Sequence, residues 1–402
     1  MVQGGPWHDA AASCRKRPRR ASSWMLAGAA CILRDRLGQL CYSGAMSRRD
    51  MTRAVGSSMV TLAPAGADAM SFDLTPPPPR SRTYSLVVQE AGLEDWQLPD
   101  YEAMRDDVPR TSKFASAIKR RLAAQPGATV VDIGTGPFAL LALIAARAGA
   151  KKVYAIEKNE AAAKAAQAFV AKEGFADKVV VIAGDSMKVN LPEQCDFVVS
   201  ELIGSIATQE GVTPIIADAR NRFLTPEASA RGMIPERCQT LIAPIKYKGR
   251  SAVDRFTKPV QGLRSRGIPS PGTATTLRVP AESAGYFELL SQPQPLEDFD
   301  YNATTPEDLK KPQERDLLFD LPDQDGLQFS GFALWTRVVV DREDVIDVRE
   351  QPDSHWAYVI VRMVTNPPAV SLAPHPGAVR LKAGIDYTAL PVRYGLEATV
   401  QV

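Results

Sequence analysis

The sequence is poor in the side chains that hold metal ions and disulfides. It contains 5 cysteines and 3 histidines among 402 residues. The cysteines are spread along the chain without the spacing of metal ligands, at Cys14, Cys31, Cys41, Cys195 and Cys238. We therefore expect no bound metal and a reducing compartment.

Long apolar runs and an excess of one charge are also missing. No apolar stretch approaches the roughly 20 residues that are needed to cross a bilayer. The 48 basic and 46 acidic residues nearly cancel and leave a net charge of +2. We therefore predict no membrane partner and no direct nucleic-acid partner. A chain of this length should form about two to three domains and bury a large core.

The first segment, residues 1–85, differs in composition from the rest. A basic run at 15–20 lies within a stretch without acids, 10–34, and prolines follow at 76–79. We interpret the segment as a tail with three competing roles: a disordered extension, a nuclear-localisation patch, or an organelle transit peptide. The protein is accordingly expected in the cytoplasm or nucleus, or in an organelle if the tail is a transit peptide.

What the chain does contain is a glycine turn between a strand and a helix. The β-favouring residues 129–131 lead into Asp132, Gly134 and Gly136, and an Ala/Leu-rich stretch follows at 138–148. Glycines allow the backbone to turn sharply and to approach a ligand closely, and the first amides of the following helix attract an anion. This pattern predicts a nucleotide-type cofactor site at Asp132, Gly134 and Gly136.

A second strand, predicted at 153–157, ends in a carboxylate about 25 residues after the turn begins. From this position Glu157 can accept hydrogen bonds from both ribose hydroxyls. The glycine turn and the acid together predict the cofactor site more strongly than either does separately.

Two further interpretations of the turn stay open. Gly134, Gly136 and Ala139 fit the dinucleotide fingerprint, which would indicate an NAD(P)-dependent oxidoreductase. Glycines can also serve the geometry of a turn without any ligand. Asp132 just before the glycines, together with the residues downstream, favours S-adenosyl-L-methionine as the cofactor.

Further helices and strands are predicted on both sides of the turn. Helical spacing over 101–122, interrupted by Pro109, predicts two helices before the first strand of the sheet. A helix at 160–173 is followed by a strand at 178–182. After that strand comes Asp185, placed to contact adenine or ribose, with Ser186 beside it.

A fourth strand, predicted at 196–200, delivers Glu201 to the carboxyl edge of the sheet, where doubly wound folds bind their ligands. The loop that begins there contains Gly204 and ends near Glu210, so two carboxylates flank one loop. This loop resembles the double-glutamate loop of protein arginine methyltransferases, with the same spacing between the two acids.

Other segments resemble the same family in the same order. Residues 101–111 resemble its segment before the first strand, where an arginine holds the cofactor carboxylate and an acid reaches the active site. Residues 331–335 resemble its Gly-Phe barrel strand, and 354–356 resemble its Thr-His-Trp loop. The matches cover roughly residues 100–365.

The resemblance implies an enzyme that uses S-adenosyl-L-methionine and methylates accessible arginines of proteins, including Arg/Gly-rich ones, with homodimer formation as a possible property. It implies cofactor binding by Arg110. It also assigns catalytic or substrate-binding roles to Met104, Asp107, Glu201, Glu210, His355 and Trp356. Whether the product is mono-, symmetric or asymmetric dimethylarginine is left open.

The chemistry of arginine agrees with these roles. A guanidinium is charged at any working pH and its lone pairs are delocalised, so it is a poor nucleophile. Two carboxylates, Glu201 and Glu210, could draw charge toward the nitrogens they touch. They would also offset a repulsion between two cations of about 4 kcal/mol at ~4 Å and an effective dielectric near 20. His355 is the candidate proton acceptor and Asp107 the residue that orients it.

The chain is thus expected to be α/β: a class I methyltransferase-like doubly wound sheet at 86–245, followed by a β-barrel-like substrate domain at 246–402. The second expectation rests on β-type runs after Pro244. Three alternatives are kept: a methyltransferase for another amine, an NAD(P)-dependent oxidoreductase, and a catalytically inactive cofactor-binding relative.

Two departures from the family pattern concern the cofactor. Phe138 stands where the third glycine of the family's turn is expected, and Asp95 and Trp96 stand where the family's lid helix has tyrosine and phenylalanine. The lid over the cofactor is therefore not identified from the sequence.

Overall fold

The computed structural model describes residues 80–88, 98–249, 275–363, 369–389 and 391–402. All of them belong to one compact unit, Thr75–Val402. The basic run of the tail, its three cysteines, and Asp95 and Trp96 lie outside the described residues. In the described part of the chain, no helix is long and apolar enough to cross a membrane.

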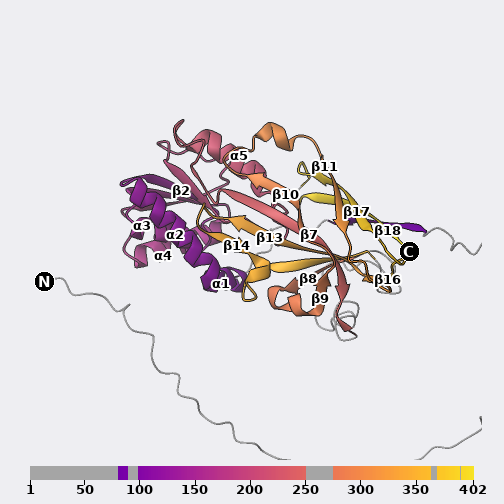
Figure 1. Ribbon diagram of the computed structural model, residues 1–402. Coiled ribbons are helices and arrows are strands. Elements are labelled where there is room, and N and C mark those ends of the chain that lie inside the picture. Colours follow the sequence, from indigo (N-terminus) through magenta and orange to yellow (C-terminus); the bar gives the residue numbers. More distant parts are fainter. Residues whose placement is uncertain (1–79, 89–97, 250–274, 364–368, 390) are drawn as a thin grey trace, which may run out of the picture. The chain divides into compact units, whose positions relative to one another are not determined.

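A five-stranded parallel sheet forms the first half of this unit, in the order β4-β3-β2-β5-β6 (Figure 1). Its strands are β2 (Thr129–Ile133), β3 (Lys152–Glu157), β4 (Val179–Ala183), β5 (Phe197–Ser200) and β6 (Met233–Ile234). The chain runs outward from β2 to β4 on one side and returns through β5 on the other. The carboxyl ends of β2 and β5 therefore border the point where the strand order reverses, which is where such sheets bind ligands.

The first four helices follow the predicted order, and the fifth was not predicted. The helices are α1 (Leu98–Asp106), α2 (Val108–Ala124), α3 (Leu140–Arg147), α4 (Glu160–Lys172) and α5 (Val212–Phe223). The break predicted at Pro109 is confirmed, because the proline occupies the first turn of α2, where its missing N–H costs nothing. The side chain of Asp107 caps this helix by accepting from the amide of Arg110 at 3.0 Å.

Two antiparallel sheets make up the β-rich second half. The seven-stranded sheet has the order β10-β7-β13-β15-β8, with β14 added to β13 and β9 added to β7, and the four-stranded sheet has the order β1-β18-β17-β11. The first comprises β10 (Gln294–Asp300), β7 (Arg237–Tyr247), β13 (Gly331–Val339), β15 (Ala357–Arg362), β8 (Thr275–Pro280), β14 (Val345–Asp347) and β9 (Phe287–Leu289). The second comprises β1 (Ser81–Val88), β18 (Arg393–Gln401), β17 (Ala378–Asp386) and β11 (Gln313–Asp320).

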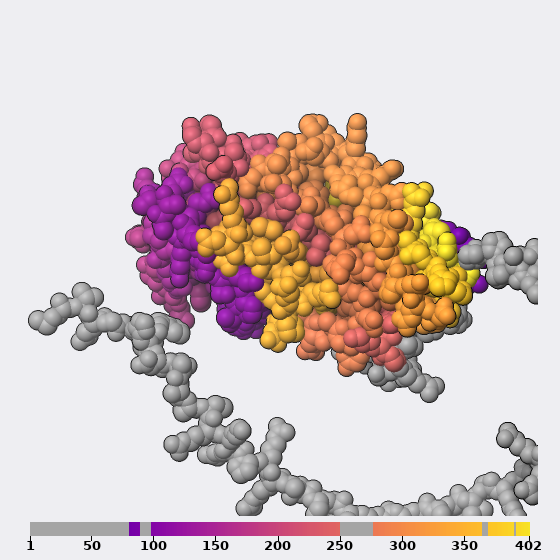
Figure 2. Space-filling view, viewed as in Figure 1, coloured from indigo at the N-terminus to yellow at the C-terminus, as the bar shows by residue number. Residues whose placement is uncertain are grey.

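Short elements complete the β-rich half: strands β12 (Gln328–Phe329) and β16 (Val370–Ser371), and the 3-10 helices η3 (Ala281–Tyr286), η4 (Pro306–Leu309) and η5 (Val348–Glu350). Helix α2 contacts this half directly. Arg120 pairs with Asp341 at 2.7 Å and with Asp344. Figure 2 shows the surface of α2 meeting that of the β13–β14 segment. The α/β and β-rich halves thus share an interface along α2.

Two boundaries in the structure differ from those predicted. Residues 85–88, expected to open the α/β part, lie in β1, which pairs along its whole length with β18. Alternation predicts a strand but not its partner, and this partner lies about 300 residues away in the sequence. After the α/β half, the chain enters the β-rich half at the start of β7, residue 237, rather than after residue 245.

The second difference concerns Pro244, after which we expected the β-type runs to begin. Strand β7 pairs with β10 as far as Ile242 and with β9 from Ile245. Pro244 lies between these partners, and its carbonyl accepts from the amide of Leu290 at 2.8 Å. Proline lacks the amide N–H that would pair with a neighbouring strand, but Pro244 lies where β7 changes partner. The strand therefore continues through this residue.

Gly331, at the start of β13, provides a test of this sheet. Its φ is +141°, and a Cβ there would lie 2.1 Å from the carbonyl oxygen of Val361 on β15. Gly331→Ala should lower the free energy of unfolding by about 1–3 kcal/mol, measured by urea denaturation. The matched control is Gly384→Ala in β17, where a Cβ would meet nothing within 4 Å. Equal stability of the two variants would contradict the close approach of β13 and β15.

Candidate active site

The glycine turn after β2 has the conformation that its sequence predicts. Gly134 and Gly136 have φ of +75° and +63°, a region that residues with a side chain seldom adopt. A Cβ on Gly134 would lie 2.4 Å from Cδ2 of Leu202. The loop after β5 therefore lies directly against the turn after β2, at the switch point of the sheet.

Asp132 ties this turn to helix α3. Its Oδ2 accepts from the hydroxyl of Thr135 at 2.6 Å and from the amide of Ala142 at 3.0 Å. Burial raises the pKa of Asp132 to about 7, although these two hydrogen bonds act in the opposite direction. Asp132 thus shapes the turn, and its predicted cofactor contact stays a prediction.

Glu157 ends β3 beside the turn and is buried. Its carboxylate accepts from the amide of Gly136 at 2.9 Å and from that of Asn159 at 2.8 Å. On the neighbouring strand, Asp185 follows β4 and is half-buried, and Ser186 is buried. Apart from Arg110, which lies on α2, the predicted cofactor residues therefore lie at the carboxyl ends of three adjacent strands, β2, β3 and β4.

Arg222 on α5 was not identified from the sequence. Its guanidinium donates to the carbonyls of Ser186 at 2.6 Å and Val189 at 2.7 Å, and it pairs with Asp218 on its own helix. It therefore fixes the segment after β4 to α5. The pair Asp218–Arg222, four residues apart on a helix, is too common a pattern to have indicated this role.

Helix α1 covers the turn, and the sequence analysis did not identify it as a lid. A Cβ on Gly136 would lie 3.4 Å from the ring of Tyr101. One helical turn later, the guanidinium of Arg105 lies 4.8 Å from the ring centroid of Phe138. Burial and then the charge of Glu157 raise the pKa of Tyr101. Two large side chains four residues apart, in the helical stretch that precedes the first strand of the sheet, are the signal that could have revealed this helix as a lid.

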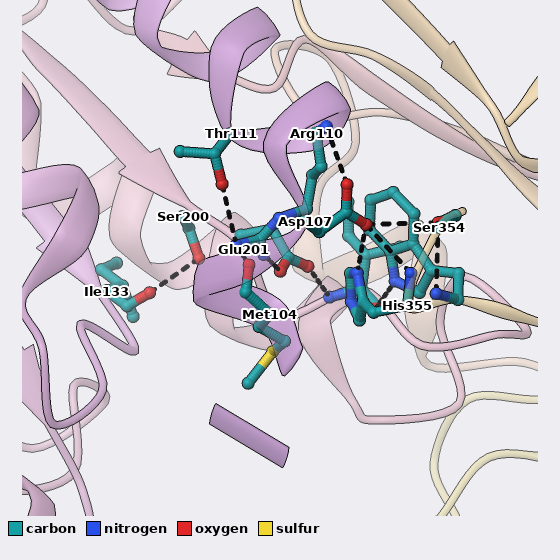
Figure 3. Close-up of polar contacts among 11 residues, drawn as sticks. Met104, Asp107, Arg110, Thr111, Ile133, Ser200, Glu201, Ser354 and His355 are labelled. Carbon is teal, nitrogen blue, oxygen red and sulfur yellow. Dashed lines mark hydrogen bonds and ion pairs between the residues drawn. The ribbon is translucent and has the colours of Figure 1, made fainter. Parts of the chain in front are cut away.

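Asp107 and His355 are in direct contact, as their predicted roles require. Nδ1 of His355 lies 2.8 Å from Oδ2 of Asp107, and the backbone amide of His355 donates to the same oxygen at 3.0 Å (Figure 3). The Asp107 side chain is 1% exposed and that of His355 11%. Burial acts to raise the pKa of Asp107, but the hydrogen bonds from His355 and from the Arg110 amide outweigh it and lower the pKa to about 2.

Arg110 and Glu201 form a buried ion pair that the sequence analysis did not anticipate. Nη1 of Arg110 donates to Oε2 of Glu201, and each side chain is 6% exposed (Figure 3). Arg110 Nη2 donates to the carbonyl of Met104 at 2.6 Å, while Glu201 Oε1 accepts from the amide of Ile203 at 3.1 Å. Arg110 Nε is buried and has no hydrogen-bond partner among the described residues.

These contacts bring four of the candidate residues into one connected set, in the order His355, Asp107, Arg110 and Glu201. Glu210 is half-buried and precedes Gly211, which caps α5. The connected set joins the first turn of α2 to the loop after β5 and to the start of β15.

Trp356 and the loop after β5 are held together. Trp356 is 2% exposed, and its indole N–H donates to the carbonyl of Ile203 at 2.7 Å. Its predicted substrate-binding role stays a prediction. Across the described residues, no group of three or more His, Cys, Asp or Glu is arranged to hold a metal ion.

A parallel sheet with a glycine turn at its switch point, followed by antiparallel β sheets, is the fold of a class I methyltransferase with a β-barrel-like domain. The chain is similar to the Trypanosoma brucei PRMT1 enzyme–prozyme heterotetrameric complex with AdoHcy. The TM-score is 0.56 at 19% identity, over 71% of this chain and 87% of that one. This likeness shows a shared fold.

The sequence comparisons find protein arginine methyltransferases among the similar proteins. Residues 100–230 match the family model described as PRMT5 arginine-N-methyltransferase. The chain is 30% identical to the probable protein arginine N-methyltransferase 6.1 of Oryza sativa subsp. indica, over 59% of this chain and 61% of that protein. It is 36% identical to the probable histone-arginine methyltransferase 1.3 of Arabidopsis thaliana, over 33% of this chain and 24% of that protein. The chain is similar to protein arginine N-methyltransferases over these stretches, and it spans less than two thirds of the length of these two relatives.

Asp107→Asn should change how stability depends on pH. A lowered pKa means that the stabilisation is present above the ordinary value of 3.8 and is lost as the pH falls through about 2. From about pH 5 to about pH 2, the parent should therefore lose about 2 kcal/mol more unfolding free energy than Asp107→Asn. Urea denaturation at several pH values measures this difference.

The control for that experiment is Asp106→Asn, the adjacent exposed carboxylate, which pairs with Arg105. Its stability should follow the parent's pH dependence closely. Parallel pH curves for the parent and Asp107→Asn would contradict the buried Asp107–His355 contact.

Proposed function

We propose that the protein transfers methyl groups from S-adenosyl-L-methionine to guanidino nitrogens of arginine in protein substrates. The observation that carries the proposal is the position of Glu201. Its carboxylate already binds a guanidinium, that of Arg110, and the next residue, Leu202, lies against the glycine turn. A carboxylate suited to binding arginine thus lies beside a glycine turn suited to binding the cofactor.

The residues present fit this cofactor. The turn at Gly134 and Gly136 offers closely approachable backbone, and Glu157 lies beside it with carboxylate oxygens that can accept further hydrogen bonds. Arg110 has a buried Nε without a partner among the described residues, which suits a carboxylate ligand. Glu157 would hold the ribose hydroxyls, Asp185 and Ser186 the adenosine side, and Arg110 the carboxylate. When bound, S-adenosyl-L-methionine supplies an electrophilic methyl group on a positively charged sulfur.

Glu201 and Glu210 are the proposed clamp for the substrate guanidinium. Glu201 uses one oxygen on Arg110 and the other on the Ile203 amide. A carboxylate has about four lone-pair positions, so each oxygen can accept one more donor. Accepting from the substrate would draw positive charge toward the bound nitrogens and leave another nitrogen to attack the methyl group.

His355 and Asp107 are the proposed route for the proton that the methylated nitrogen releases. Nδ1 of His355 faces the ionised Asp107, which leaves Nε2 as the nitrogen that can accept a proton. Asp107 would hold the ring in this orientation and stabilise its protonated form. Because Asp107 is buried and the His355 side chain is only 11% exposed, little water competes for this contact.

Further parts of the proposal rest on the family. Accessible arginines of proteins, Arg/Gly-rich segments among them, are the proposed acceptors, and a homodimer is the proposed assembly. The related Trypanosoma brucei protein is described as a heterotetrameric complex with AdoHcy, which supports the cofactor and assembly in general terms. The cytoplasm or nucleus is the proposed compartment of the protein. The alternative is an organelle, if residues 1–85 contain a transit peptide.

The cofactor proposal is tested by calorimetry with S-adenosylhomocysteine and NAD side by side. S-adenosylhomocysteine should bind, and Glu157→Ala should weaken it ten- to a hundredfold, or roughly 1.5–3 kcal/mol, through loss of hydrogen bonds to a charged acceptor. Glu227→Ala, which removes an exposed acid distant in sequence, is the control and should bind as the parent does. Binding of NAD without S-adenosylhomocysteine would overturn the proposal.

The acceptor proposal is tested by methyl transfer onto an Arg/Gly-rich peptide and a matched peptide with lysine in place of arginine. Glu201→Gln and Glu210→Gln should each abolish most turnover, because the amide keeps the size but removes the charge that offsets the substrate cation. The two losses should be non-additive, since both groups act on one guanidinium.

Glu201→Gln also leaves Arg110 without its charged partner, so melting curves and S-adenosylhomocysteine binding must be measured with it. Glu210→Gln leaves the Arg110–Glu201 pair intact and serves as the cleaner variant. Glu227→Gln is the matched surface control. Methylation of the lysine peptide only, or full activity in Glu210→Gln, would overturn the arginine assignment.

A further inference from the structure

Glu297 is a fully buried carboxylate in the β-rich half that has no part in the proposed chemistry. Strand β10 has a register shift between Pro295 and Glu297 in its pairing with β7. Regular alternation would turn Leu296 and Glu297 to opposite faces, but this irregularity leaves both buried. The strand therefore directs an ionisable group into the space between the two sheets, where an unpartnered one would be costly.

The carboxylate of Glu297 accepts hydrogen bonds from three hydroxyls. Thr208 and Tyr394 donate to Oε1, the latter at 3.1 Å, and Thr240 donates to Oε2. Tyr394 lies on β18 of the four-stranded sheet and Thr240 on β7 of the other. Thr208 belongs to neither sheet, because it lies in the loop between Glu201 and Glu210. Burial raises the pKa of Glu297, and the threonine hydroxyls oppose this rise.

The contact through Thr240 reaches the same loop by a second route. Its hydroxyl accepts from the amide of Ala207 at 2.9 Å, so the single hydroxyl hydrogen is left to donate to Glu297. Two consecutive loop residues, Ala207 and Thr208, are therefore held by one carboxylate. Both are buried, so no water competes for these bonds.

Thr208 in turn sets the backbone around Glu210. Its carbonyl accepts from the amide of Gly211 at 2.9 Å, closing a turn that contains Glu210. Gly211 has φ of +75° and caps α5, so the turn passes directly into a helix. Once Thr208 and α5 are fixed, little freedom is left for the backbone of Glu210.

We propose that Glu297 is a positioning residue, which holds the Glu210 half of the loop through Thr208 and through Thr240. It touches neither substrate nor cofactor. The proposal rests on the function proposed above for Glu210, and it assigns the β-rich half a direct share in the geometry of the carboxylate clamp.

The test is Glu297→Gln, which keeps the shape of the side chain. It replaces one carboxylate oxygen by an amide nitrogen, which cannot accept a hydrogen bond from a threonine hydroxyl. We expect kcat to fall about tenfold or more, as for a lost hydrogen bond to a charged acceptor. Binding of S-adenosylhomocysteine should stay within about twofold of the parent, a change below 0.5 kcal/mol. Asp298→Asn, on the same strand but with its side chain exposed in a surface ion pair, is the matched control and should keep full activity.

A double variant separates positioning from general destabilisation. If Glu297 acts through Glu210, adding Glu297→Gln to Glu210→Gln should cause no further loss of turnover. If the losses multiply instead, Glu297 does not act through Glu210 and the proposal is overturned. An unchanged kcat in Glu297→Gln overturns it equally.

Hydrogen exchange gives a readout that does not need activity. In Glu297→Gln the amides of residues 203–211 should exchange faster than in the parent and in Asp298→Asn, with Ala207 affected most. An unchanged exchange pattern would overturn the proposal. If the parent methylates no arginine peptide, the proposed function fails, and this measurement still decides whether Glu297 holds the loop.

Thr240→Val covers the case in which Glu297→Gln does not fold. It removes the link between Glu297 and the Ala207 amide but leaves the carboxylate its bonds from Thr208 and Tyr394. We expect a smaller loss of kcat and faster exchange at Ala207. Parent values for both would contradict the proposed link.

Discussion

Asp107 divides its two carboxylate oxygens between distant parts of the chain. Oδ1 accepts from the amide of Arg110 and so starts α2, while Oδ2 holds both the ring and the backbone of His355. Because α2 then carries Arg110 to Glu201, the placement of the β15 start, the helix and the loop after β5 depends on one side chain. Its near-complete burial makes this dependence strict, since water cannot replace either partner at low cost.

Much of the fold could be predicted because the local pattern of apolar and turn-forming residues indicates which positions are buried and where the chain turns. The strands around Asp132 and Glu201 and the helix break at Pro109 follow from periodicity and turn chemistry, and they are confirmed. The contact between Asp107 and His355 was expected from the family resemblance, together with the chemistry of a carboxylate that orients an imidazole. What the sequence could not reveal are partners distant in the chain, such as β18 for β1 and Glu201 for Arg110, because no periodicity encodes them.

The loop after β5 obtains its shape from the β-rich half rather than from its own residues. Its carbonyls accept from side chains of that half: Ile203 from Trp356, and Gly204 from Thr336 at 2.7 Å. Two hydroxyls, a carboxylate and an indole thus satisfy loop groups that an isolated α/β domain would leave to solvent. Sequence reasoning had given the β-rich half a substrate-binding role and the candidate proton acceptor His355, but no part in shaping this loop.

The adjacent residues His355 and Trp356 contact different segments. His355 is hydrogen-bonded to Asp107, which caps α2, and Trp356 donates to the loop after β5. Moving the β-rich half away from the sheet would therefore break both contacts together, which makes such a hinge motion costly. Helix α1 is held differently: it has no buried side chain, although Tyr101 and Arg105 lie over the glycine turn. Displacing α1 therefore exposes less buried surface than separating the two halves. Of these elements, α1 is the one that can most easily move away from the glycine turn.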